Sequence, residues 1–330
     1  MAATKSKCPD SLSAALRGVL AAAVSPGEPL WVALSGGRDS VVLLHLLAQA
    51  GWDGPLGAIH VHHGLSPRAD AWEAFCQALC TRLGIPLHVR AVQVALHSGL
   101  GLEAAARAAR YQAFAEFGPG CLLLGHHAGD QAETVLFNLL RGAGVAGAAG
   151  MPLERRLDSL RLLRPLLGVA RREIAAYARS HDLTWVEDES NADQGFSRNF
   201  LRHEVLPLLI SRFPAAEATL AAAAGRFGEA DALLAELAEQ DWQSCRSGGY
   251  LRLTALRSLS RVRVKNLLRY RLRALGWQVP VATRLEEFVR QLFEAGPGAR
   301  PQLVLPDGAM RVCRGRLEWR RASPRTGEKP

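Results

Sequence analysis

The chain contains 330 residues, of which 48% are hydrophobic and 22% are charged. This length and composition predict a folded globular protein with two domains, and they exclude a disordered or membrane-spanning chain because no apolar run approaches the ~20 residues of a transmembrane helix. The net charge of +9 is uneven, with a net of +1 over residues 1–214 and +8 over residues 215–330, which indicates a polyanionic partner such as nucleic acid or, alternatively, a solubilising surface.

The N-terminal region predicts an amphipathic helix rather than a signal peptide. Its apolar stretch Ala14–Val24 is interrupted by Arg17 and ends at Ser25-Pro26-Gly27 without a clear cleavage site. The six cysteines form no Cys-x-x-Cys pair, so we expect buried free thiols in preference to a metal or redox site. Free thiols favour a reducing compartment, which predicts a cytoplasmic protein.

Strand-like and helix-like segments alternate through the first half of the chain. This alternation predicts an α/β fold, a Rossmann-like parallel sheet with helices on both faces. The expected strands are Leu30–Leu34, Leu56–Val61, Leu87–Val94 and Cys121–Gly125, and the expected helices are Ser40–Ala50, Ala69–Leu83, Leu102–Phe117 and Asp130–Arg141. Ligands of such sheets bind beyond the carboxyl ends of the strands, where Ser35–Ser40, His60–Leu65 and His126–Glu133 all fall.

The clearest functional motif is the segment Ser35-Gly36-Gly37-Arg38-Asp39-Ser40, between the first strand and its helix. A strand, a glycine turn and a helix N-terminus form an anion site, because the backbone approaches the ligand closely and the helix dipole favours negative charge. Asp39 would repel a phosphate unless a cation such as Mg²⁺ lies between them. The segment is neither a Walker-A loop nor a dinucleotide fingerprint, so it predicts a different nucleotide site, with an ordinary glycine turn as the alternative.

The rest of the first domain, expected to end at residue 214, contains one unusual loop. The small residues of Gly142–Gly150 predict a mobile substrate loop with little side-chain packing. An Arg-rich stretch follows, then an expected helix Ala170–His181, an acidic loop at residues 187–191 and an expected helix Phe200–Leu209.

The second domain, expected over residues 215–330, is predicted to be a smaller, mostly helical α+β unit. A long connecting helix, Ala215–Trp242, opens it, and Arg321–Pro330 is expected to be disordered. Further helices are expected at Arg261–Arg273 and Arg284–Glu294, and strands at Gln302–Leu305 and Met310–Arg316. The candidate nucleic-acid contacts lie on the first of these helices: Arg261, Arg263, Lys265 and Arg269.

Five segments taken together resemble the tRNA(Ile)-lysidine synthetase family of PP-loop ATP pyrophosphatases. The resemblance covers roughly residues 29–214, and the basic extension is similar to a short form of that family's tRNA-binding C-terminal domain. The segments are Ser35–Ser40, His60–Leu65, Gly125–Thr134, Arg141–Gly144 with Gly150-Met151, and Glu187–Asn191 with Ser197–Arg202.

The resemblance implies a two-step reaction on the wobble cytidine of tRNA(Ile) with the anticodon CAU. The cytidine O2 attacks the α-phosphate of ATP and releases pyrophosphate. The ε-amine of L-lysine then attacks C2 and releases AMP, giving lysidine, so that the tRNA reads AUA and is charged with isoleucine. ATP and Mg²⁺ are the implied cofactors, and the oligomeric state stays open, a homodimer included.

The resemblance also implies a role for individual residues. Asp39, Asp130 and Glu133 are the expected catalytic residues, and Asp39 is the expected Mg²⁺ ligand. Asp130 and Glu133 share one helix face and suit an ammonium substrate, although acidic residues at a helix N-terminus also complement the dipole. The expected ATP-binding residues are Ala33, Ser35, Gly36, Gly37, Arg38, Asp39, Ser40, His60, His126 and Arg141.

Two arginines and several histidines each have two possible roles. Arg198 and Arg202 are expected to contact tRNA phosphates, or else to pair with the acidic residues Glu187, Asp188 or Glu189. His126 and His127 are expected to contact nucleotide or substrate in preference to zinc, because adjacent residues of an extended segment point in different directions. His60, His62 and His63 have either such a role or a structural one.

One departure from the family pattern bears on catalysis. The family usually shows two consecutive aspartates before the glutamine, whereas this chain has Gly129-Asp130. We expect Asp130 to carry the role alone. The alternatives are another PP-loop enzyme such as a tRNA thiolase, which the missing Cys-x-x-Cys disfavours, a glutamine-fed synthetase, which would need an amidotransferase domain, and a catalytically inactive tRNA-binding protein.

Overall fold

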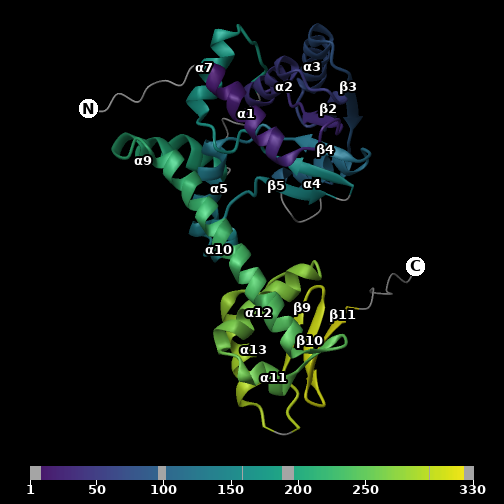
Figure 1. Cartoon of the computed structure of the whole chain (residues 1–330), viewed down its shortest axis with the longest axis vertical. Helices are drawn as coiled ribbons and strands as arrows, with labels where there is room; N and C mark the ends of the chain where they lie inside the picture. Colours follow the sequence, from purple (N-terminus) through teal and green to yellow (C-terminus); the bar gives the residue numbers. More distant parts are fainter. Residues whose placement is uncertain (1–8, 96–101, 158, 188–196, 297, 323–330) are drawn as a thin grey trace. The chain divides into compact units, whose positions relative to one another are not determined.

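The computed structural model describes residues 9–95, 102–157, 159–187, 197–296 and 298–322. The chain divides into two compact units, Met1–Gly228 and Glu229–Pro330, each with its own sheet (Figure 1). The division falls inside the long helix α10, Ala216–Cys245.

A six-stranded sheet forms the centre of the first unit. Its order is β3-β2-β1-β4-β6-β5, and neighbouring strands run parallel except β5, which pairs antiparallel with β6. The strands are β1 Leu30–Ala33, β2 Leu56–His62, β3 Leu87–Ala91, β4 Gly120–Leu123, β5 Glu154–Leu157 and β6 Leu160–Leu163. The four expected strands are confirmed, and the Arg-rich stretch adds a hairpin that the sequence analysis had not assigned.

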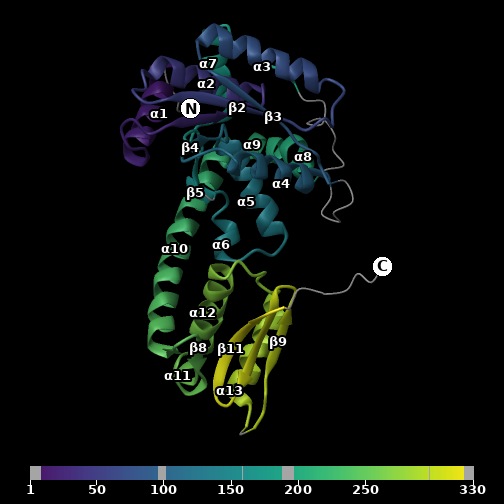
Figure 2. The same cartoon turned by 90° about the vertical axis from the view of Figure 1, so that its right-hand side faces the viewer.

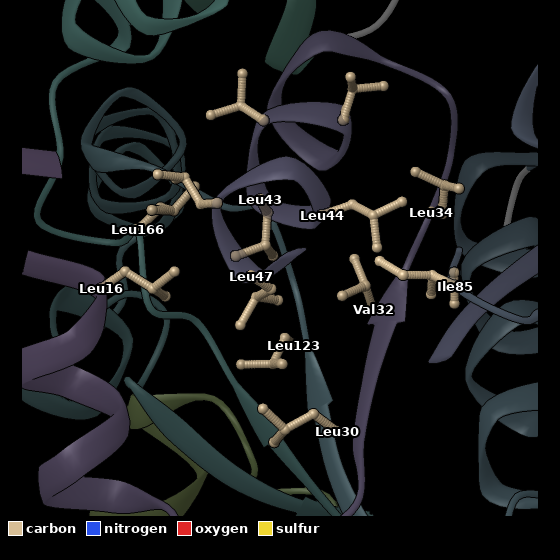
Figure 3. Close-up of a cluster of buried hydrophobic side chains, with 14 of the residues drawn as sticks. Leu16, Leu30, Val32, Leu34, Leu43, Leu44, Leu47, Ile85, Leu123 and Leu166 are labelled. Carbon is tan, nitrogen blue, oxygen red and sulfur yellow. The ribbon is translucent and has the colours of Figure 1, made fainter. Parts of the chain in front are cut away.

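Helices cover both faces of this sheet, as expected. The alternation of β1 sends Leu30 and Val32 into a core with helices α1, α2 and α7, which Figure 3 shows in close-up. The intervening Trp31 and Ala33 pack on the other face beside Phe114 of α4. The helices are α1 Pro9–Ala23, α2 Arg38–Ala50, α3 Ala69–Leu83, α4 Leu102–Ala115, α5 Ala128–Leu140 and α7 Arg171–Ser180.

The loop expected to lack side-chain packing contains a short helix, α6, Val145–Ala148. The side-chain amide of Gln131 both donates to and accepts from the backbone of Met151, at 2.9 and 2.8 Å. Asn138 Nδ2 donates to the Gly147 carbonyl at 2.8 Å, and Ala148 is buried. The expectation of little packing is therefore wrong, because two amide side chains of α5 hold the loop.

The helix predicted at Phe200–Leu209 is present as part of a longer helical segment whose pitch changes along its length. It consists of α8 Ser197–Phe200, a π-helical segment η2 Leu201–Val205 and α9 Leu206–Arg212. The acidic residues Asp188 and Glu189, predicted as alternative ion-pair partners, lie outside the described residues.

The second unit packs helices against a five-stranded antiparallel sheet of order β7-β8-β11-β10-β9. The single strand expected at Met310–Arg316 is wrong, because a turn with positive φ at Arg314 and Gly315 divides it. The elements after α10 are β7 Arg246–Ser247, β8 Tyr250–Arg252, α11 Leu253–Ser258, α12 Arg261–Ala274, α13 Ala282–Glu294, β9 Gln302–Leu305, β10 Gly308–Cys313 and β11 Arg316–Arg321. Residues 323–330, expected to be disordered, lie outside the described part.

The described cysteines are free, and four of them are buried: Cys76, Cys80, Cys121 and Cys245. Burial raises the pKa of the Cys76 and Cys121 thiols to about 12, which keeps them protonated and unreactive. Over the described residues, no single helix is long and apolar enough to cross a membrane, although one bent pair, 197–212 with 216–245, meets the criterion by length and composition.

Candidate active site

The site lies where the order of the sheet reverses, beyond the carboxyl ends of β1 and β4. The loop Ser35–Gly37 follows β1, and the loop that ends at His127 follows β4. The two loops approach closely at Gly125, where a Cβ atom would lie 3.0 Å from the carbonyl carbon of Asp39. Glycine at this position therefore allows the two loops to form one site.

The nucleotide loop is preorganised by its two serines. Ser40 Oγ donates to the Gly37 carbonyl at 2.8 Å and lies 3.1 Å from Ser35 Oγ. Gly36 has a φ of 83°, and a Cβ there would lie 2.8 Å from Val186 Cγ2. Both the backbone conformation and the lack of space therefore disfavour any larger residue at this position. No side chain caps the N-terminus of α2, so its first amides remain directed at the loop.

Asp39 lies in the first turn of α2, between the side chains of Arg38 and His127. Its Oδ1 accepts from Arg38 Nε at 3.0 Å, and its Oδ2 lies 3.6 Å from His127 Nε2. Burial by itself would raise the pKa of Asp39, but the interactions with His127 and Arg38 outweigh burial and lower the pKa. Asp39 is therefore ionised at neutral pH, with about a third of its side chain (32%) exposed.

His127 joins the two loops and begins helix α5. Its Nδ1 accepts from the backbone N–H of Gly129 at 3.0 Å and of Asp130 at 3.3 Å, and the Asp130 carboxylate accepts from the His127 N–H at 2.9 Å. Burial opposes the charged ring, yet Asp39 and Asp130 raise its pKa. Since protonation of Nδ1 would break the cap, the ring that fits this geometry is neutral with its Nε2–H directed at Asp39.

The two carboxylates of α5 share one guanidinium. Arg202 Nε and Nη2 donate to the two oxygens of Glu133 at 2.7 and 2.8 Å, and Nη2 also donates to Asp130 at 3.1 Å. Of the two predicted roles of Arg202, the structure shows ion pairing, with partners other than the acidic loop. The α5 carboxylates face a cation, which is the chemistry expected of an ammonium site.

Glu133 has the environment of a group that can accept a proton. Burial raises its pKa, while Arg202 acts in the opposite direction without cancelling this effect. Its side chain is 8% exposed, against 20% for Asp130. A buried carboxylate with a raised pKa is suited to general-base catalysis near neutral pH.

His126 lies in a basic environment that the sequence analysis had not identified. The pKa of His126 is lowered to about 4. Burial is the largest cause, the charge of Asp130 opposes it, and the charges of Arg164, Arg107 and Arg110 act in the same direction as burial. His126 Nδ1 and Arg164 Nε are buried without a hydrogen-bond partner among the described residues. In the sequence, this basic environment is indicated only by Arg107 and Arg110, which lie three residues apart on one face of α4.

The second-strand histidines have structural partners. His60 is buried, and its Nδ1 lies 2.8 Å from the Leu34 carbonyl, so this ring donates to the end of β1. His62 Nε2 lies 2.9 Å from Asp70 on α3. The hydrogen bond at Nδ1 leaves Nε2 of His60 for a ligand, and the contact of His60 with ATP stays a prediction.

Two more predicted residues lie close to one aromatic ring. The guanidinium carbons of Arg141 and Arg198 lie 5.0 and 5.6 Å from the ring centroid of Phe137 on α5. Phe200 on α8 is 49% exposed. Arginine and aromatic groups together suit the unstacked bases and phosphates of a single-stranded RNA loop.

The predicted basic helix of the second unit, α12, has most of its charges paired. Arg261 binds Glu294 at 3.1 Å and Lys265 binds Glu286 at 2.6 Å. Arg263 binds Asp241, which is fully buried. Arg269 has no ion pair with any described carboxylate.

The position of the departure from the family pattern, Gly129, faces two side chains. A Cβ there would lie 2.8 Å from His127 Cε1 and 3.4 Å from a carboxylate oxygen of Glu217, in the first turn of α10. The glycine thus accommodates the capping ring, and a carboxylate from a distant part of the chain lies beside it. No sequence pattern marked Glu217.

A Mg²⁺ ion fits this site only together with phosphate. Among the described residues, no group of three or more histidine, cysteine or acidic side chains is arranged to hold a metal ion. Mg²⁺ commonly takes one or two carboxylates and completes its shell with phosphates and water. The ionised, partly exposed Asp39 beside the nucleotide loop meets that requirement.

Comparison with known proteins gives consistent matches over both units. Residues 12–209 match the PP-loop domain family, and residues 251–318 match the TilS substrate binding domain family. The chain is 49% identical to a tRNA(Ile)-lysidine synthase of Aromatoleum aromaticum, covering 89% of this chain and 69% of that protein. It is 44% identical to a synthase of the same description from Nitrosomonas europaea, covering 97% of this chain and 71% of the relative.

Among solved structures, the chain resembles the U34-tRNA thiolase NcsA from Methanococcus maripaludis. The TM-score is 0.55 at 18% sequence identity, covering 67% of this chain and 79% of that one. At this identity the similarity shows a shared fold.

Proposed function

Because this chain belongs to the tRNA(Ile)-lysidine synthase family, an ATP-dependent ligase that forms lysidine on tRNA(Ile), we propose that the site around Asp39 carries both steps of the reaction. One observation supports the assignment above others. The nucleotide loop and the α5 carboxylates meet through the contact of Asp39 with His127, so ATP and an ammonium substrate would lie side by side.

In the first step, the cytidine O2 attacks the α-phosphate of ATP and pyrophosphate leaves. The loop Ser35–Gly37 and the first amides of α2 bind the phosphates and stabilise the developing charge. Asp39 would hold Mg²⁺ together with the phosphates, and the ion would neutralise the leaving group. The arginines near the buried His126 supply positive charge that would stabilise the phosphates of ATP.

In the second step, the ε-amine of lysine attacks C2 of the adenylated cytidine and AMP leaves. Asp130 and Glu133 would hold the lysine ammonium where the structure places the Arg202 guanidinium. Glu133 then accepts a proton from the amine, because its raised pKa lies closer to neutrality than that of an exposed glutamate. In this proposal Arg202 moves aside when lysine binds, and Gly129 needs no second carboxylate.

The proposal is tested by incorporation of labelled lysine into a tRNA(Ile) transcript with ATP and Mg²⁺. Incorporation is expected with wobble cytidine and not with wobble uridine, and Asp39→Ala is expected to abolish it. Glu133→Gln is expected to accumulate adenylated tRNA and pyrophosphate with little lysidine, which separates the two steps. Incorporation unaffected by either substitution would remove these residues from the mechanism.

Oligomeric state is independent of this mechanism. A homodimer remains a prediction, which sedimentation equilibrium of the full chain tests.

A further inference from the structure

The five-stranded sheet of the second unit has one apolar face, which packs on helices, and a second face that carries polar and charged side chains. Figure 1 shows α12 and α13 on the same side of this sheet, and Figure 2 shows the strands from a second direction. Leu251, Leu303, Met310, Val312 and Leu317 point toward the helices and are buried. Since side chains alternate along a strand, the residues between them form the other surface.

That surface, the outer sheet face, is rich in arginine. It contains Tyr250 and Arg252 on β8, Arg311 on β10, and Arg316 and Arg320 on β11. The register places Arg316 opposite Arg252 and Arg311 opposite Glu318. Four arginines therefore share one face with a single glutamate.

Most of these charges lack an acidic partner. Within the described part of the chain, Arg252, Arg311 and Arg316 form no ion pair, and Arg320 has only Glu318 at 3.5 Å. On the helical side of the same unit, Arg261, Arg263, Lys265 and Arg273 each pair with a carboxylate. Arg269 and Arg271 of α12 also form no ion pair with a described carboxylate, so three of the four arginines on the sheet face are unpaired, against two of the six basic residues of α12.

Two of the side chains are also held in place. The Arg316 guanidinium lies over the Tyr250 ring, 4.4 Å from its centroid, and Arg252 Nη2 donates to the Ser244 carbonyl at 3.1 Å. Arg252 and Arg316 occupy directly opposite positions of β8 and β11, whereas Glu318 separates Arg316 from Arg320 along β11. This pair of exposed, held guanidinium groups complements a chain of phosphates, since guanidinium groups bind phosphate with several parallel hydrogen bonds.

We propose that the outer sheet face binds the sugar–phosphate backbone of the tRNA. The inference rests on the tRNA substrate of the proposed function and assigns a surface for it. It replaces α12 as the main electrostatic contact of this unit, because a paired cation must first lose its carboxylate partner before a phosphate gains it. Backbone contacts of this kind supply affinity and salt dependence rather than sequence specificity.

The test compares the salt dependence of tRNA binding in the full chain and its variants. The double variant Arg252→Gln with Arg316→Gln is expected to lower the slope of log K against log salt by about 1.4–1.8, at about 0.7–0.9 per lost phosphate contact. The KM for tRNA is expected to rise while the KM for ATP stays the same. Lysine at both positions is expected to keep the slope, because the charges remain.

Arg290→Gln serves as the matched control. Arg290 is an exposed arginine of α13, paired with Glu287 and Glu294, and its loss is expected to leave the slope unchanged. An unchanged slope in the Arg252/Arg316 glutamine variant overturns the inference. So does loss of the slope in an Arg261→Gln, Lys265→Gln variant, which would assign the contact to α12.

Failure of the proposed function gives a different result. If the parent chain binds tRNA through these arginines but incorporates no lysine, the function is wrong and the surface stands. If the parent forms lysidine and the glutamine variant sediments as a smaller species without a change in tRNA affinity, the face joins two copies of the chain and the inference is wrong.

Discussion

Replacing Arg202 with methionine leaves the two α5 carboxylates without their cationic partner. Glu133 is 8% exposed and Asp130 20% exposed, so water replaces the guanidinium only in part. Removing one member of such a buried pair costs about 3–5 kcal/mol. For a unit of 228 residues, at ~2–4 °C for each kcal/mol, the midpoint of thermal unfolding is expected to fall by roughly 6–20 °C.

The loss depends on pH in a direction that the structure determines. Burial raises the pKa of Glu133 and Arg202 opposes this, so the pKa rises further in the variant. Between the unfolded value of 4.5 and the raised folded value, the folded variant binds more protons than the unfolded chain. Stability of the variant therefore falls as pH rises through this range, and the deficit shrinks as pH approaches 4.5 and below.

Urea unfolding of parent and variant at pH 5 and pH 8 measures this difference. Arg212→Met, an exposed arginine at the end of α9, is the control and is expected to change stability by no more than about 0.5 kcal/mol. Adding Glu133→Gln to the Arg202 variant is expected to recover part of the loss at pH 8, because the uncompensated charge is gone. A deficit below about 1 kcal/mol, or one that is equal at both pH values, would refute the account of this cluster.

Three further outcomes are expected. Asp39→Asn keeps the shape of the side chain and removes its charge, so tRNA-dependent pyrophosphate release is expected to fall about 100-fold or more in a coupled assay; a smaller loss would exclude Asp39 from the first step. Gly36→Ala is expected to destabilise the fold in urea by more than Gly64→Ala, because both have positive φ but only the first brings a Cβ to 2.8 Å from Val186; equal losses would contradict the contact. Iodoacetamide at pH 8 is expected to label Cys76 only in urea, since burial raises its pKa to about 12, and labelling of the folded chain would show that the thiol is accessible.

Local patterns in the sequence predicted the elements that hold the site. Apolar, strand-like segments located β1 and β2, and the glycine turn with its two serines located the nucleotide loop. These features depend on neighbours within a few residues, so they can be read without knowing the fold. The resemblance to a family then assigned a reaction to them, which the comparisons support.

Contacts between distant segments were decided by the tertiary structure. Arg202 lies 69 residues after Glu133, and a π-helical segment places its guanidinium between the α5 carboxylates. Glu217 comes beside Gly129 in the same way. The sequence did not predict which of these distant residues would meet, because every charged residue has several possible partners.

The same distinction applies to charge. The sequence by itself determined that the last third of the chain is strongly basic. It did not determine which face holds free charge, because α12 and the outer sheet face are both rich in arginine. Only the folded chain brings carboxylates of other helices to α12 and leaves the arginines of the sheet without them, since the energy of a charge depends on what lies a few ångströms away.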